Sequence, residues 1–345
     1  MDKILLEDCC EILDSMRVPI TSSDRVEGPY PYYGANGIQD HVSDYIFDDE
    51  LVLLAEDGGN FGSKERPIAY RVSGKCWINN HAHVLKPKEG LDVDYLCYSL
   101  MFYNVGGMVN GATRQKLTQA AMRKMLIRKR SLEEQKFIVN IIKKVVSVKE
   151  KRQKELEKID ELIKARFVEL FGDPVSNSKE LPIATLPELG EFGRGVSKHR
   201  PRNDPKLLGG DYPLIQTGDV AAAELYITDY SATYSELGLK QSKIWDKGTL
   251  CITIAANIAK TAILTFDACF PDSVVGFMAN ERTSNIFIHY WFSFFQAILE
   301  SQAPESAQKN INLKILSELK VINPSKEAQV EFEKFVKQVD KSKVV

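Results

Sequence analysis

One long stretch of the chain has apolar residues at the spacing of a helix. Between residues 131 and 171 they recur every three or four positions, with Lys and Glu between them. Ser131 and Glu134 have the spacing of a capping box, and Gly172-Asp173-Pro174 ends the run. The pattern predicts one helix of roughly 40 residues, which at 1.5 Å per residue spans about 60 Å.

The apolar stripe of this helix needs a partner along its whole length. Residues 326–345 show a similar pattern and are the candidate partner within the chain, but this segment is only about half as long. Part of the long helix therefore needs another partner, or the second helix has been cut short. We expect the stripe to meet other subunits through Ile138, Ile141, Val145, Ile159, Ile163 and Leu170.

The rest of the sequence favours strands mixed with short helices. Apolar stretches with β-branched residues are interrupted by Gly, Pro and Asn, as in strands joined by turns. Segments 94–105 and 285–296 carry aromatic residues at helical spacing, which is typical of buried helices. A short strand then precedes each of the two helix starts, at 125–129 and 319–323.

The order of these elements is repeated, which indicates a tandem duplication. Four pairs of segments correspond in the same order, and in the last pair Gln135 meets Gln329. The pairs are 30–38 with 212–220, 51–62 with 250–261, 94–105 with 285–296, and 111–146 with 305–340. The sequence therefore consists of two similar modules, each followed by a helix.

The composition fits a folded protein of two domains. The chain has 345 residues, of which 44% are hydrophobic, and a domain typically takes roughly 150 residues. No apolar run approaches the roughly 20 residues of a membrane span, and the N-terminal segment lacks the pattern of a signal peptide. Forty-five basic against 47 acidic residues give a net charge of −2, so affinity for nucleic acid has to come from local patches.

The residues that usually carry chemistry form no recognisable site. The six cysteines include no CxxC pair, which favours buried side chains in a reducing compartment, and we expect a cytoplasmic protein. His81 and His83 are spaced to face one side of a strand, but no further metal ligand is near them in sequence, so hydrogen-bonding roles are favoured. The glycines at 58, 59 and 62 lack the spacing of a phosphate loop, and no amino-methyltransferase motif occurs. We therefore predict neither catalytic residues nor a metal site.

These features together resemble the specificity subunit of type I restriction–modification enzymes. Besides the duplication, the resemblance is carried by YPYYGANGI and YPLIQTGDV, NNHAHVLKP, SLEEQKFIV at the helix start and LFGDPVSN after the helix. It implies an α+β fold with two tandem α/β target recognition domains, separated by long helices that form an antiparallel coiled coil whose second helix is short. The implied boundaries are 1–130 for target recognition domain 1 (module 1), 131–173 for the central spacer helix, 174–324 for target recognition domain 2 (module 2) and 325–345 for the short C-terminal spacer helix.

The resemblance also implies a function. Each recognition domain would read one half of a bipartite double-stranded DNA site, and the spacer would dock two methyltransferase subunits and, through them, the restriction and translocase subunits. The chain itself would be non-catalytic and hold no cofactor, with S-adenosylmethionine, ATP and Mg²⁺ in the partner subunits. A second copy of this chain is another candidate partner for the helices. Two alternatives stay open: a coiled-coil adaptor with two protein-binding ends and no affinity for DNA, and a methyltransferase in its own right.

DNA contact requires basic side chains for phosphates and amide or guanidinium groups for base edges. Loops rich in such groups occur in both modules, although an ordinary solvated loop is the alternative for each. In module 1 the candidate DNA contacts are Asn60, Lys64, Arg66, Arg114, Gln115 and Lys116. In module 2 they are Arg194, Lys198, Arg200, Arg202, Asn257, Lys260, Gln308, Lys309 and Asn310.

Overall fold

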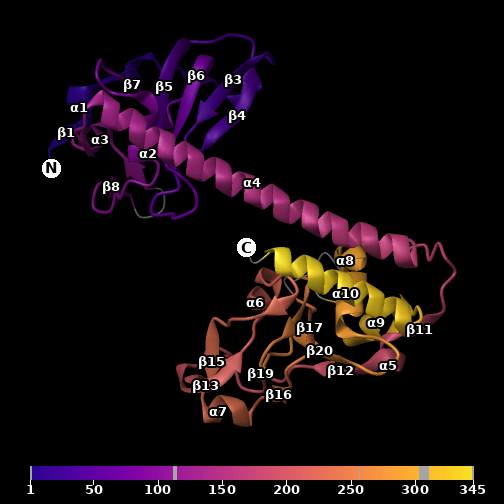
Figure 1. Ribbon diagram of the computed structural model, residues 1–345. Coiled ribbons are helices and arrows are strands. Elements are labelled where there is room, and N and C mark those ends of the chain that lie inside the picture. Colours follow the sequence, from indigo (N-terminus) through magenta and orange to yellow (C-terminus); the bar gives the residue numbers. More distant parts are fainter. Residues whose placement is uncertain (1, 112–114, 256, 303–310, 344–345) are drawn as a thin grey trace. The chain divides into compact units, whose positions relative to one another are not determined.

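The chain divides into two compact units, Met1–Arg152 and Gln153–Val345. The computed structural model describes residues 2–111, 115–255, 257–302 and 311–343 (Figure 1). The first unit holds module 1 and the first part of the long helix α4 (Leu132–Phe171), and the second holds the rest of α4, module 2 and the C-terminal helix. Both units combine helices with sheets, so the predicted α+β class and tandem arrangement are confirmed.

Module 1 is built on a sheet with the strand order β2-β7-β5-β6-β3-β4. β3 runs parallel to β6, whereas the other neighbours are antiparallel. Helix α2 covers β5 and β6 and adds the buried Leu96 and Leu100 to the core. The elements are β1 (Lys3–Leu5), α1 (Leu6–Cys9), β2 (Cys10–Ile12), η1 (Asp14–Met16), η2 (Ser22–Asp24), β3 (Tyr30–Gly34), β4 (Gly37–Val42), β5 (Phe47–Ala55), β6 (Ala69–Ile78), β7 (Ala82–Pro87), α2 (Val93–Leu100), β8 (Val109–Asn110), β9 (Lys116–Leu117), α3 (Gln119–Arg123) and β10 (Leu126–Arg128).

Module 2 repeats this order in β12-β20-β17-β18, with β14 beside β18, and adds a second sheet in the order β15-β13-β19-β16. Helix α8 takes the place of α2 and buries Phe287 and Trp291. The elements are β11 (Ile183–Thr185), α5 (Leu186–Leu189), β12 (Gly190–Arg194), η3 (Pro205–Leu207), β13 (Leu208–Leu214), α6 (Thr217–Ala222), β14 (Tyr226–Ile227), β15 (Ala232–Tyr234), α7 (Glu236–Lys240), β16 (Ile244–Trp245), β17 (Leu250–Thr253), β18 (Thr261–Leu264), β19 (Ala268–Cys269), β20 (Val274–Ala279), α8 (Asn285–Gln302), α9 (Leu313–Glu318), β21 (Lys320–Ile322) and α10 (Lys326–Lys343).

Strand pairing confirms the duplication predicted from the sequence. In module 1, Tyr32 of β3 pairs in parallel with Trp77 of β6. In module 2, Leu214 of β13 pairs in parallel with Cys269 of β19. Tyr32 and Leu214 are also the residues that the sequence comparison places against each other, so β18 and β19 together correspond to β6.

The two glutamines matched by the duplication have the same role in both modules. Gln135 and Gln329 are buried near the starts of α4 and α10. Each side chain donates to the carbonyl five residues earlier, at 3.0 Å in both cases. Each also donates to a loop carbonyl of its own module: Gln135 to Gly90 O at 2.9 Å and Gln329 to Arg282 O at 3.0 Å. These bonds fasten each helix to the module before it.

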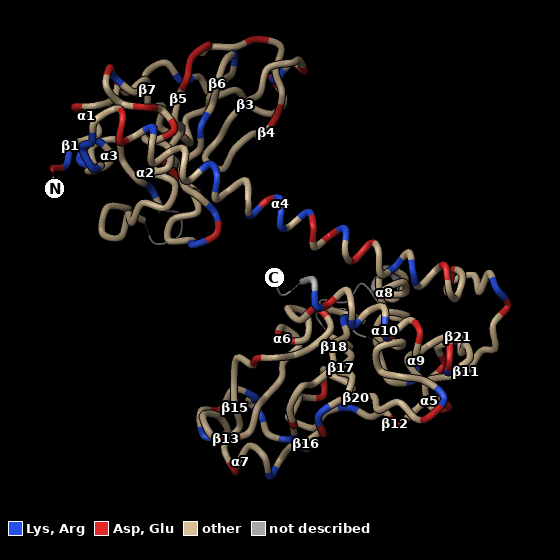
Figure 2. The backbone as a smooth tube through the Cα atoms, viewed as in Figure 1, with Lys and Arg blue, Asp and Glu red and all other residues tan. Residues whose placement is uncertain are grey.

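The long helix begins and ends where the sequence predicts. Ser131 caps it, because its Oγ accepts from Glu134 N at 3.2 Å while the Glu134 carboxylate accepts from Ser131 N at 2.9 Å. The second part of α4 packs on α10, which runs antiparallel to it (Figure 1): the ring of Phe332 lies 5.3 Å from that of Phe167. The predicted short partner helix is therefore present, and Figure 2 shows basic and acidic residues alternating along α4.

The cysteines are buried free thiols, as expected. Burial raises the pKa of Cys76 to about 12 and that of Cys97 to about 11, which disfavours the reactive thiolate. Among the described residues, no helix is both long and apolar enough to cross a membrane.

Candidate nucleic-acid interface

Three loops of module 1 come together beyond the end of β5. Asp57 forms an antiparallel bridge with Lys116 of β9. Gly58 N donates to Gln115 O at 3.4 Å, and the side chain of Asn36, in the turn between β3 and β4, donates to Gly58 O at 3.0 Å. The polar residues 115 and 116 are thus placed beside the segment that follows β5.

The same segment carries the other described candidates of module 1. The side chain of Asn60 donates to Asn36 Oδ1 at 3.2 Å. Lys64 and Arg66 are exposed, and Ser63 Oγ accepts from Arg66 N at 2.9 Å, which orders the chain between them. The structure therefore brings the amide of Asn60 close to residues 115 and 116 and leaves two cations on the adjoining loop.

Asn36 is a functional candidate that the sequence reasoning missed. It precedes Gly37, which has a φ of 110° in the turn between β3 and β4. An Asn-Gly pair between two strands is a strong hairpin signal, so the turn itself was predictable from the sequence. Its contact with Asn60 was not, because the two residues lie 24 positions apart in the chain and meet through tertiary packing.

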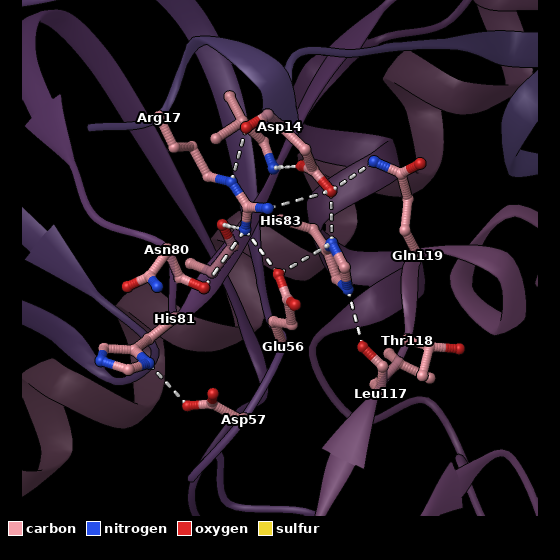
Figure 3. Close-up of polar contacts among 12 residues, drawn as sticks. Asp14, Arg17, Glu56, Asp57, Asn80, His81, His83, Leu117, Thr118 and Gln119 are labelled. Carbon is pink, nitrogen blue, oxygen red and sulfur yellow. Dashed lines mark hydrogen bonds and ion pairs between the residues drawn. The ribbon is translucent and has the colours of Figure 1, made fainter. Parts of the chain in front are cut away.

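A charged cluster is buried directly beneath these loops (Figure 3). His83 of β7 is fully buried; its Nδ1 lies 2.7 Å from Asp14 Oδ2 and its Nε2 lies 2.8 Å from Leu117 O. Arg17 donates to Glu56 Oε2 at 2.6 Å. Each ring nitrogen of His83 therefore lies at hydrogen-bond distance from an oxygen atom.

Glu56 links the cluster to the loop surface. Its carboxylate accepts from Arg17 inside the module and lies 3.0 Å from Lys116 Nζ on the outside. Burial by itself would raise the pKa of Glu56, but the hydrogen bonds from Arg17 and Lys116 outweigh it and hold that pKa below its ordinary value. Glu56 is therefore ionised at neutral pH and fixes the half-exposed lysine.

Asp14 gathers the remaining contacts of the cluster. Its carboxylate accepts from Val84 N and from Gln119 Nε2, each at 2.9 Å. Burial opposes ionisation, yet the hydrogen bond and positive charge of His83, together with these donors, lower the pKa of Asp14 below its ordinary value. Asp14 thereby ties β7 to Gln119, the first residue of α3.

The cluster contains the residue types of a metal site, but the guanidinium of Arg17 already supplies a positive charge to its carboxylates. One ligand atom each from Asp14, Glu56 and His83 lie within 4.8 Å of one another. The guanidinium of Arg17 lies 2.6 Å from Glu56 and 3.6 Å from Asp14, so both carboxylates already have a cationic partner. The hydrogen-bonding role predicted for His83 is found. His81 lies just before β7 and not within the strand, and its Nδ1 lies 2.7 Å from Asp57 Oδ1.

In module 2, the basic loop after β12 divides into paired and exposed cations. Arg200 and Arg202 both form ion pairs with Asp272. Arg194 and Lys198 are exposed, and the described part of the chain offers their side chains no ion pair. The two exposed cations are therefore the better candidates for phosphate contact, whereas the two paired arginines shape the loop.

The second loop of module 2 lies next to the first. Asn257 and Lys260 are exposed between β17 and β18. Ile254 N at the start of this loop donates to Ser273 O at 3.0 Å, and Ser273 follows Asp272, the partner of the two arginines. The structure therefore joins both predicted basic loops of module 2 through one turn.

Four of the predicted DNA contacts lie outside the described residues: Arg114, Gln308, Lys309 and Asn310. The chain after the last three is fastened by Ile311 N, which donates to Ile254 O at 2.9 Å. In module 1, Leu117 N donates in the same way to Glu56 O at 2.7 Å, so both polar segments end at equivalent places.

Helix α4 carries a second candidate surface. Apolar residues on its first part are exposed, among them Phe137 (66%), Ile141 (45%), Val145 (63%) and Val148 (67%). Ile163 is fully buried in the core of the second unit, against which Ile159 and Leu170 also pack. Ile163 therefore belongs to the chain's own core and does not face another subunit as expected, which leaves the first part of α4 as the accessible stripe.

Comparison with known proteins points to one family. The family model of the type I restriction modification DNA specificity domain matches residues 1–158 and 184–344. A putative type I restriction enzyme specificity subunit of Haemophilus influenzae is 30% identical over 296 residues, which cover 84% of this chain and 75% of that protein. The EcoprrI type I specificity subunit of Escherichia coli is 24% identical over 115 residues, covering 33% of this chain and 27% of that protein.

A solved structure shares the fold. The type I restriction-modification S subunit of M. genitalium superposes with a TM-score of 0.58 at 14% sequence identity. The alignment covers 99% of this chain and 90% of that one. Two modules with helices between and after them are thus a fold shared with a specificity subunit of known structure.

Proposed function

The chain belongs to the type I restriction–modification DNA specificity family, and from this premise we propose that each module reads one half of a bipartite double-stranded DNA site. The observation that carries the proposal is the convergence of polar loops in each module. In module 1, Asn36 joins Asn60 to Gly58, and the neighbouring Asp57 forms a bridge with Lys116. Amide and ammonium groups on neighbouring loops are suited to base edges and phosphates, respectively.

We propose further that the chain is a non-catalytic subunit that works in the cytoplasm. Its partners would be two methyltransferase subunits, with the restriction and translocase subunits joining through them. S-adenosylmethionine, ATP and Mg²⁺ would then be bound by those partners. The exposed stripe from Phe137 to Val148 supports a docking role, because soluble proteins seldom leave such an apolar strip uncovered.

The first experiment is a DNA titration of the complex with its methyltransferase at two salt concentrations. We expect the affinity for a cognate duplex to fall about tenfold or more between 50 and 200 mM salt, because phosphate contacts release counterions. Calorimetry of the isolated chain with S-adenosylmethionine should detect no binding. Affinity that ignores salt, or a chain that binds only proteins, would favour the adaptor, and cofactor binding would favour a methyltransferase.

A further inference from the structure

Two buried charged residues of module 1, His83 and Glu56, occupy positions that are apolar in module 2. His83 of β7 pairs with Leu54, and at the same place in module 2 Val275 of β20 pairs with Ile252. Val275 is buried in the core of its unit. Module 2 therefore builds the same strand pairing without a histidine.

Glu56 has an apolar counterpart as well. Its N donates to His81 O at 2.9 Å, as Ile254 N donates to Ser273 O at 3.0 Å. Ile254, like Val275, is buried in an apolar cluster. In both modules the carbonyl of this residue also accepts a backbone hydrogen bond: Glu56 O from Leu117 N, and Ile254 O from Ile311 N. This backbone attachment therefore requires no charged side chain.

Burying charges is costly where apolar side chains suffice. Ion pairs in a protein interior can often be replaced by well-packed apolar residues without loss of stability. Module 2 shows that this scaffold accepts apolar residues at the positions of His83 and Glu56, yet module 1 keeps both almost fully enclosed beside Asp14 and Arg17. The packing of the sheet therefore does not require a charge at these two positions.

Three residues of the cluster, Glu56, His83 and Asp14, contact one short segment, residues 116–119. Glu56 holds Lys116 Nζ at 3.0 Å, His83 Nε2 lies 2.8 Å from Leu117 O, and Gln119 donates to Asp14 at 2.9 Å. A lysine side chain has many rotamers in water, and ordering it costs conformational entropy. The cluster places the ammonium group of Lys116 in advance. It also fixes the backbone beside Lys116, through the contact of His83 with Leu117 O (Figure 3).

We propose that the buried cluster positions Lys116 and its neighbour Gln115 for reading the half-site of module 1, which makes His83 and Glu56 positioning residues for specificity in that module alone. The inference rests on the proposed function, since it assigns the cluster to recognition of DNA. Module 2, with Val275 and Ile254 instead, must hold its reading residues by other means.

The test transplants the apolar pair of module 2 into module 1. The double variant His83→Val with Glu56→Ile and the single variant Glu56→Gln are each purified in complex with the methyltransferase. Methylation of a duplex library then measures the preference at each half-site. We expect the preference at one half-site to fall at least about fivefold in both variants, the lower end of the discrimination that one base contact gives. The other half-site should keep its preference.

Glu50→Gln is the matched control. Glu50 lies on β5, the strand that Glu56 follows, pairs with Arg71 and is about half exposed. We expect wild-type preference at both half-sites for this variant. Lys116 loses its carboxylate partner in both test variants, so we also expect their affinity for non-specific DNA at low salt to be equal to or greater than that of the wild type. General damage to the module would lower it.

The outcomes distinguish the positioning role of the cluster from the proposed reading of DNA by the modules. A wild-type complex without sequence preference would overturn both. A wild-type complex that prefers a bipartite site, with unchanged preference in folded Glu56→Gln and in the folded double variant, would overturn only the positioning role. If the double variant fails to fold, module 1 needs its charges for packing, and the inference then stands or falls with Glu56→Gln.

Discussion

At the residue scale, the ionised carboxylates of the cluster make the stability of module 1 dependent on pH. The pKa of Asp14 is lowered in the folded protein, so its contribution is complete above the unfolded value near 3.9 and is lost as pH falls through the folded value. Asp14→Asn should therefore lower the free energy of unfolding at pH 7 by roughly 3 kcal/mol, as expected for breaking a buried pair. It should also flatten the pH dependence between about pH 5 and pH 2.

Urea titrations followed by circular dichroism across this pH range would check the prediction. The exposed Asp48→Asn in the same module is the control and should track the wild type at every pH. A loss of stability that is equal at pH 7 and pH 2 would mean that the contribution of Asp14 does not depend on its charge.

At the element scale, the accessible and buried parts of the α4 stripe should respond differently to the same change. Ile141→Glu with Val145→Glu alters exposed positions, so we expect the chain to fold normally but to lose co-purification with the methyltransferase at least about tenfold. Ile163→Glu buries a charge in the core of the second unit and should destabilise it by on the order of 4 kcal/mol. Thermal unfolding and pull-down assays on both variants measure these effects, and normal assembly of the exposed double variant would contradict the docking role.

The elements also show what the sequence could predict. The bounds of α4 were predicted to within a residue, because its caps are local signals at Ser131 and at residues 172–174. The duplication was predicted too, yet the comparison of 51–62 with 250–261 places Leu54 against Thr253, one residue away from the Ile252 that strand pairing gives. Ladder hydrogen bonds fix that register, and a sequence comparison does not include them.

The candidate site was less predictable than the fold. Lys116 and Asn60 are predictable as candidate DNA contacts, because their ammonium and amide groups are visible in the sequence. The cluster beneath them joins Asp14 to His83, 69 positions apart in the chain, and such a contact depends on tertiary packing. The absence of a nearby ligand in sequence therefore concealed the carboxylates that surround His83.

At the scale of the whole molecule, two modules with different loops imply an asymmetric DNA site. Module 1 offers Asn60, Gln115 and Lys116, whereas module 2 offers the exposed Arg194 and Lys198. Because each set lies within its own unit, replacing the cations of one module should alter one half-site only. Arg194→Ala with Lys198→Ala should weaken binding about threefold to thirtyfold at physiological salt and reduce the salt slope by about two.

The measurement is a map of methylated sites in cells that express this double variant with its methyltransferase. We expect lower occupancy and relaxed preference in one half of the site, with the other half as strict as in the wild type. Arg200→Ala with Arg202→Ala is the comparison: both residues are paired with Asp272, so their loss should act through loop shape and leave the salt slope nearly unchanged. Equal relaxation of both halves by Arg194→Ala with Lys198→Ala would mean that this loop does not serve module 2 alone, and the assignment of one half-site to each module would fail.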